Sequence, residues 1–80
     1  MKVTVLLFAR YSELAGRTRI EVNVPEGATL ARVWDGVRES VPALRAERQP
    51  LMACDRAYAR PERVIGGHEE IAAFPPVSGG

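Results

Sequence analysis

The fold is decided by the first apolar stretch of the chain, residues 2–8, which read Lys-Val-Thr-Val-Leu-Leu-Phe. The β-branched residues in this stretch are typical of a strand. Because side chains alternate along a strand, Val3, Val5 and Leu7 share one face, and the opposite face is also mostly apolar. A strand that is apolar on both faces is typical of the interior of a sheet, so we expect residues 2–8 near its centre.

The segments that follow predict a short helical turn, a second strand and one long helix. Residues 10–16 predict the helical turn, closed by a glycine suited to a left-handed cap. Residues 18–24 alternate strictly between polar and apolar side chains, which predicts a half-buried strand. Apolar residues at helical spacing predict a helix over residues 30–41 with Thr29 as its N-cap. Pro42 ends this helix, because the residue before a proline disfavours the helical backbone.

The second half of the chain predicts shorter strands. Residues 51–54 and 57–59 flank a turn, and residues 70–74 form a last strand that is apolar after its first residue. We expect the first and last strands to be central, because they carry the most continuous apolar patterns. A hairpin, one main helix packed across one face and returning strands make an α+β fold with a mixed sheet, the ubiquitin-like β-grasp. We place this domain at residues 1–76, with residues 77–80 as a flexible, projecting Gly-Gly tail.

Composition excludes several classes of protein. The chain has 80 residues, enough for one domain, and a net charge of +1 with both signs dispersed, whereas a nucleic-acid binder usually carries a basic stripe. Its longest apolar run is too short to span a bilayer. One cysteine allows neither an intrachain disulfide nor a Cys-rich zinc site, which fits the reducing cytoplasm. We therefore expect a cytoplasmic protein with no metal, nucleic-acid or membrane partner.

Few side chains are suited to catalysis. With a single histidine and a single cysteine, a nucleophile with its base and orienting group is hard to assemble. His68 fits a solvated turn, and Cys54 lies in an apolar run, where it fits a small buried hydrophobe. Glu69 and Glu70 are adjacent, so on a strand their side chains would point to opposite faces. No glycine-rich loop precedes a lysine, and we expect the chain alone to bind no cofactor and to have no turnover.

The C-terminal heptad, Phe74-Pro75-Pro76-Val77-Ser78-Gly79-Gly80, carries the strongest functional signal. The two prolines favour an extended exit from the sheet, and residues without a Cβ can enter a tunnel too narrow for side chains. The reactive group at the tip is the α-carboxylate of Gly80. A partner enzyme that uses ATP can convert this carboxylate to an acyl-adenylate, and a sulfur donor can then displace AMP to leave a thiocarboxylate. A frayed end or an engineered remnant are the alternatives for the two glycines.

With residues 2–8, 10–16 and 24–30, this heptad resembles the small, sulfur-carrier subunit family of molybdopterin synthase. The resemblance implies that a ubiquitin-activating-like adenylyltransferase, working with a sulfur donor, converts the Gly80 carboxylate to a thiocarboxylate. It also implies that the tail inserts into the large synthase subunit of a heterotetramer and donates sulfur to cyclic pyranopterin monophosphate during molybdenum cofactor biosynthesis. The implied partner-binding residues are Phe74, Pro75, Pro76, Val77, Ser78 and Gly79.

Three other functions remain open at this point. The same tail chemistry could feed thiamine, tRNA thiolation or cysteine synthesis, the chain could be a ubiquitin-like protein modifier, or it could be a plain interaction domain. The role of Phe74 is also open, because the nearest aromatic residue to the tail could be a partner anchor or pure core.

Overall fold

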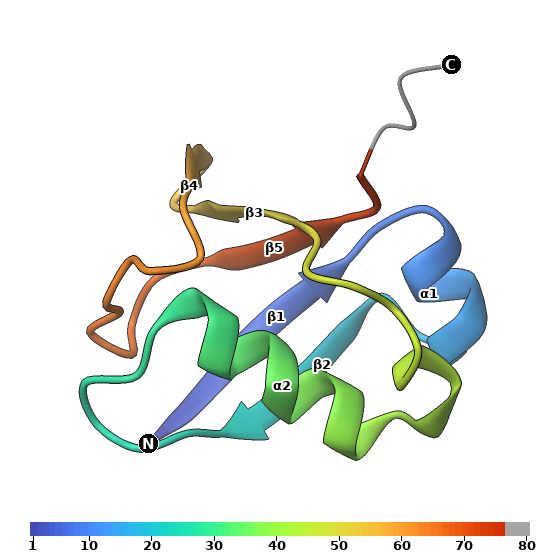
Figure 1. Cartoon of the computed structure of the whole chain (residues 1–80), viewed down its shortest axis with the longest axis horizontal. Coiled ribbons are helices and arrows are strands. Elements are labelled where there is room, and N and C mark those ends of the chain that lie inside the picture. Colours follow the sequence, from blue (N-terminus) through green and yellow to red (C-terminus); the bar gives the residue numbers. More distant parts are fainter. Residues whose placement is uncertain (77–80) are drawn as a thin grey trace.

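A mixed five-stranded sheet, with strands in the order β2-β1-β5-β3-β4, forms the body of the computed structural model, which describes residues 1–76 (Figure 1). Strands β1 and β5 are parallel, and every other neighbouring pair is antiparallel. The elements are β1 (Lys2–Leu7), α1 (Arg10–Ala15), β2 (Arg19–Asn23), α2 (Leu30–Ser40), the 3₁₀ turn η1 (Pro42–Leu44), β3 (Leu51–Cys54), β4 (Ala57–Ala59) and β5 (Ile71–Phe74).

The central position of the first and last strands is confirmed. Strand β1 lies between β2 and β5, and β5 lies between β1 and β3. Leu6 is in register with Ala72 in the parallel pair, so the ends of β1 and β5 lie at the same edge of the sheet. The segments that follow these two strands, α1 and the C-terminal residues, therefore start side by side (Figure 1).

Helix α2 packs across one face of the sheet and builds the core there (Figure 1). The predicted N-cap is confirmed, because the Thr29 hydroxyl accepts the Arg32 backbone N–H at 3.3 Å. The helix ends before Val41, which has an extended backbone and precedes Pro42. The apolar side chains of α2 are buried, and the Trp34 ring packs on that of Tyr11 with 4.9 Å between centroids.

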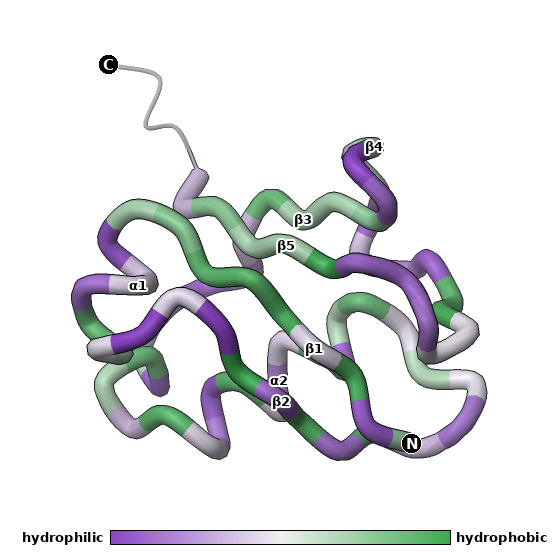
Figure 2. Tube along the Cα trace, turned by 180° about the vertical axis from the view of Figure 1, so that it is seen from behind, coloured by the Kyte–Doolittle hydropathy of each residue, from purple (hydrophilic) through white to green (hydrophobic). Residues whose placement is uncertain are grey.

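Within residues 1–76, no helix lies over β1, β5 and β3 on the other face of the sheet (Figure 2). Viewed from that side, the apolar segments of these three strands run next to one another. The apolar second face of residues 2–8 correctly predicted a central strand, but within the described residues no second layer covers it. The helices described over residues 1–76 are all too short and too polar to cross a membrane.

Candidate functional site

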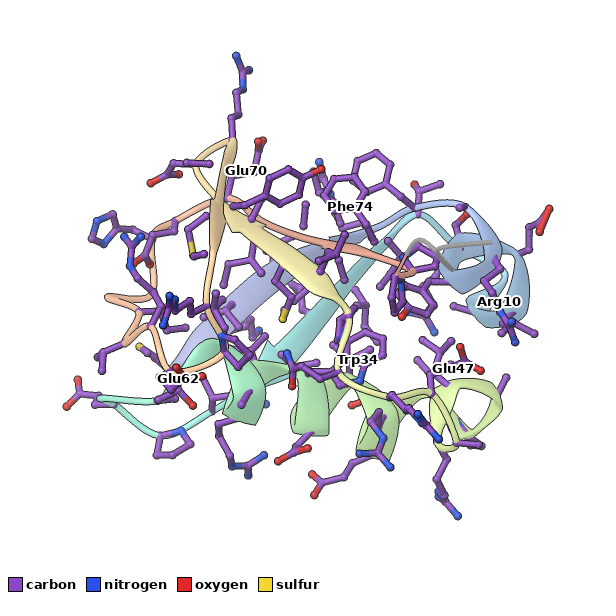
Figure 3. The ribbon with its side chains drawn as sticks, turned by 45° about the horizontal axis from the view of Figure 1, so that its top comes forward. Arg10, Trp34, Glu47, Glu62, Glu70 and Phe74 are labelled. Carbon is purple, nitrogen blue, oxygen red and sulfur yellow. The ribbon has the colours of Figure 1, made fainter. Side chains whose placement is uncertain are left out.

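Phe74, the last residue of β5, lies on the uncovered face of the sheet, on the side away from Trp34 (Figure 3). Its ring stacks on that of Phe8, with 4.7 Å between centroids and planes 12° apart. The ring of Tyr58 meets it edge-on at 6.1 Å. Phe74 is half-buried and does not belong to the buried core, so its position favours the partner-anchor alternative over the pure-core one.

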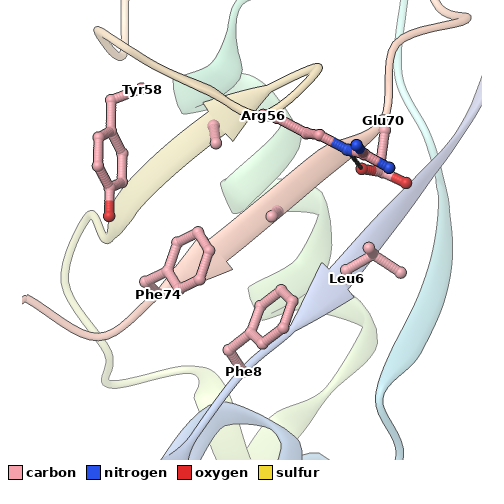
Figure 4. Close-up of a pocket in the computed structure, with 8 residues that line it drawn as sticks. Leu6, Phe8, Arg56, Tyr58, Glu70 and Phe74 are labelled. Atoms are coloured by element: carbon pink, nitrogen blue, oxygen red, sulfur yellow. Dashed lines mark ion pairs between the residues drawn. The ribbon is translucent and has the colours of Figure 1, made fainter.

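These aromatic rings border a shallow hollow of about 310 Å³ on the same face (Figure 4). Two residues at one end are charged, and Arg56 Nε there lies 3.9 Å from Glu70 Oε1. We call the remaining lining residues the apolar patch: Leu6, Phe8, Ala53, Tyr58, Ala72 and Phe74. Phe8 is 41% exposed and Tyr58 73% exposed, which is unusual for large apolar side chains without a partner.

The sequence analysis missed most of this patch. The structure places Tyr58 at the rim of the hollow, where its ring is mostly exposed. Phe8 and Leu6 were visible as the second apolar face of the first strand, but that pattern was interpreted only as evidence for a central position. The signal that could have identified the patch is the shortage of helices, because one main helix covers only one face of a sheet.

Pro75 separates the C-terminal segment from the sheet. The Phe8 N–H donates to the Ala73 carbonyl at 3.3 Å, which is the last hydrogen bond between β1 and β5. In this parallel register the next donor on β5 toward β1 is the nitrogen of Pro75, which has no hydrogen. The Phe8 carbonyl instead accepts the Tyr11 N–H at 3.1 Å, at the start of α1. The chain therefore leaves the sheet directly beside the apolar patch.

The remaining predicted tail residues, Val77, Ser78, Gly79 and Gly80, lie outside the described residues. Of the described ones, Pro76 is exposed and Pro75 is partly exposed. The structure thus places Phe74, Pro75 and Pro76 together at the edge of the sheet where the apolar patch lies.

The side chains with catalytic potential are not brought together. Burial raises the pKa of the Cys54 thiol, which disfavours the reactive thiolate. His68 is exposed in its turn, as expected. The Glu69 carboxylate accepts the backbone N–H groups of Gly66 and Gly67 at 2.8–3.0 Å, and these bonds lower its pKa to about 2. Residues 1–76 contain no group of three or more metal-ligating side chains.

The turn between β3 and β4 orders the charged end of the hollow. Asp55 donates its N–H to the Glu70 carbonyl at 2.8 Å and accepts the Glu70 N–H on Oδ1 at 2.9 Å. Asp55 and Arg56 both have positive φ, 49° and 71°. Non-glycine residues in this region are strained by roughly 1–2 kcal/mol each. The two hydrogen bonds to Glu70 hold the strained turn in place.

Comparison with known proteins agrees with the fold and with the resemblance to sulfur carriers. The sequence profile of the ThiS family matches residues 5–80. The molybdopterin synthase sulfur carrier subunit of Mycobacterium tuberculosis is 34% identical, over 100% of this chain and 99% of that protein. The protein of the same name from Arabidopsis thaliana is 31% identical, over 100% of this chain and 84% of its own length. The crystal structure of SAMP1 from Haloferax volcanii, at 27% identity, matches all of both chains with a TM-score of 0.85.

The predicted β-grasp fold and the resemblance to sulfur carriers are thereby confirmed. The profile spans nearly the whole chain, and relatives above 30% identity align along its full length. The chain therefore belongs to the ThiS family.

Proposed function

We propose that this chain is the cytoplasmic sulfur carrier subunit of a molybdopterin synthase, with the sulfur held as a thiocarboxylate on Gly80. The observation that carries the proposal is the apolar patch beside the exit of the Gly-Gly segment, together with the names of the full-length relatives. A carrier needs a reactive end and a surface by which partners hold that end in place. This chain has a candidate for each: the Gly-Gly motif in its sequence, and the apolar patch where the described chain leaves the sheet.

The chemistry starts from a carboxylate, which is a poor electrophile. A ubiquitin-activating-like adenylyltransferase directs the Gly80 carboxylate oxygen onto the α-phosphate of ATP, and pyrophosphate leaves. A sulfur donor then attacks the acyl carbon and displaces AMP, so that a C–S bond replaces the C–O bond to phosphate. In the active site of the large subunit, the thiocarboxylate sulfur forms a C–S bond to cyclic pyranopterin monophosphate in place of a C–O bond of the pterin. Water then cleaves the acyl C–S bond, so that the sulfur stays on the pterin and Gly80 returns to the carboxylate.

In this proposal the large subunit binds the apolar patch and the segment from Phe74 to Gly79. An extended peptide is ordered on binding, which lowers its affinity, so a pre-formed apolar surface at its root strengthens the complex. Phe74 and Phe8 are already stacked, and such rigid aromatic surfaces are favoured anchors in interfaces. The finished assembly is a heterotetramer of two large and two small subunits.

Altering Gly80 tests the carrier chemistry. The purified large subunit, the adenylyltransferase, ATP, a sulfide source and the pterin substrate are combined with the wild-type chain, with a variant lacking Gly80, or with a variant extended by one residue. We expect both variants to keep the wild-type melting temperature and to form no molybdopterin. The helix variant Arg32→Gln, which leaves the C-terminal residues unchanged, is the control. Undiminished product from the deletion variant refutes the proposal.

The isolated chain should bind ATP only through its partner. Titration calorimetry with Mg-ATP is expected to give no saturable heat at micromolar nucleotide, because no phosphate-binding loop is present in the sequence. Saturable binding by the chain alone would contradict the assignment of activation to a separate enzyme.

A second candidate function is protein modification, which the similarity to a structure titled small archaeal modifier protein 1 favours. In that case Gly80 would be joined to lysines of other proteins. Isopeptide-linked bands in extracts of the native host, lost when Gly80 is deleted, identify a modifier. A thiocarboxylate on the chain together with molybdopterin formation identifies the carrier.

A further inference from the structure

The inference concerns Arg56, at the charged end of the hollow (Figure 4). Cys54 pairs with Ala57, so Asp55 and Arg56 form a two-residue hairpin turn, and both have positive φ. Turns of this kind strongly favour glycine at the second central position, because glycine adopts positive φ without strain. Arg56 occupies that position with a φ of 71°. An arginine side chain therefore stands at a turn position where the backbone conformation favours glycine.

The guanidinium group of Arg56 is available to a partner. The Arg56 side chain is 90% exposed, and its contact with Glu70 is a loose one of 3.9 Å through Nε. No described residue makes a hydrogen bond or ion pair with its two terminal nitrogens. A guanidinium with free terminal nitrogens presents a planar fork that matches a carboxylate.

The position of Arg56 relates this fork to the apolar patch. Arg56 lines the same hollow as Tyr58 and Phe74. A partner that covers the patch would also approach this guanidinium, and lowering its hydration with only the loose Glu70 contact to compensate opposes binding. The partner surface must therefore supply a negative charge at this point. Glu70 is a poor substitute for an acidic group of the partner, because its 3.9 Å contact with Arg56 joins two exposed side chains and is weak.

We propose that Arg56 is a specificity residue, which selects a large subunit carrying an Asp or Glu side chain at the rim of its docking surface. This inference rests on the proposed function, because it takes the large subunit as the occupant of the apolar patch. The apolar patch supplies the contact area, and Arg56 decides which partner surface fits. The hydrogen-bonded turn fixes the backbone of Arg56 at the end of the hollow, from which its exposed side chain can reach the partner.

The test compares stability and affinity in the same variants. In Arg56→Gly, relief of the positive-φ strain leaves the melting temperature unchanged or raises it by up to about 8 °C. Binding to the large subunit, measured by calorimetry at low salt, is expected to weaken by about tenfold or more. In Arg56→Glu the weakening is larger, about 100-fold, because a like charge then faces the partner's acid. Arg32→Gln, on the helix that covers the opposite face, is the matched control and should bind normally.

Salt dependence provides a second readout. Wild-type affinity should fall between low and high salt, and this fall should be smaller in Arg56→Gly, because the screened charge pair is gone. If the wild-type chain binds and both Arg56 variants bind with the same affinity and salt dependence, the inference is overturned. The proposed function is unaffected by that result. Absence of wild-type binding refutes the docking step of the proposed function instead.

Discussion

Replacement of Phe74 by alanine separates the docking role of this ring from its role in the fold. The ring stacks on Phe8 and is half-buried, so its removal affects stability through two terms. Loss of the aromatic pair lowers the free energy of unfolding by about 0.5–1.5 kcal/mol. Loss of its partial burial lowers it by roughly another 1 kcal/mol. The sum is below the 3–5 kcal/mol typical of a fully buried phenylalanine.

The same change is expected to affect the complex more strongly. An aromatic anchor at the centre of an interface contributes about 2 kcal/mol or more, which is roughly a 30-fold increase in Kd. Urea unfolding gives the stability, and calorimetry with the large subunit gives the Kd of the same preparation. Ile71→Val serves as the matched control, because Ile71 is fully buried on the same strand. That variant should lose about 0.5–1.5 kcal/mol of stability and bind normally.

Two outcomes would contradict this account of Phe74. A loss of 3–5 kcal/mol in stability would mean that the ring acts as a core residue despite its exposure. Unchanged affinity in a folded Phe74→Ala variant would mean that the C-terminal segment binds through its own backbone contacts, without an anchor on the sheet.

Three further predictions concern the body of the fold. Gly36→Ala should raise the free energy of unfolding by about 0.5–1 kcal/mol in urea titrations, because alanine favours the helix and the new Cβ would lie 3.4 Å from Val22 Cβ, an ordinary contact. Cys54 should react with a thiol reagent only after unfolding, since it is buried with a raised pKa; fast labelling of the native protein would contradict this. The pKa of Glu69 is about 2, below its usual 4.5, so its stabilising effect should be present above pH 4.5 and lost as the pH falls toward 2. In Glu69→Gln the free energy of unfolding should depend less on pH in that range. An unchanged pH dependence would refute the stabilising role of this carboxylate.

Much of the fold could be predicted from local patterns. The alternation in residues 18–24 and the helical spacing after Thr29 predict β2 and α2 within a residue or two. These patterns are reliable because each depends on neighbours along the chain and on which side faces the core. Pro42 and Pro75 mark the ends of the helix and of the last strand. Their effect is also local, because a proline restricts its own backbone and that of the residue before it.

The candidate site was only partly predictable, for a physical reason. The C-terminal motif is visible in the sequence, because its chemistry resides in consecutive residues. The apolar patch is not, because Phe8 follows β1, Tyr58 lies in β4 and Phe74 lies in β5, and these residues meet only through the pairing of the strands. The positive φ of Arg56 was equally hidden, since arginine, unlike the Asp55 before it, is not typical of that conformation.

By itself, the sequence determined that this chain is a small β-grasp domain with a candidate reactive C-terminus, because periodicity and motif are properties of the chain. The tertiary structure decided which apolar face is covered. Residues 2–8 carry apolar side chains on both sides, but helix α2 packs on one side and leaves Leu6 and Phe8 on the other. Whether an apolar side chain is core or docking surface depends on what packs over it, and that is set by contacts between residues far apart in the chain.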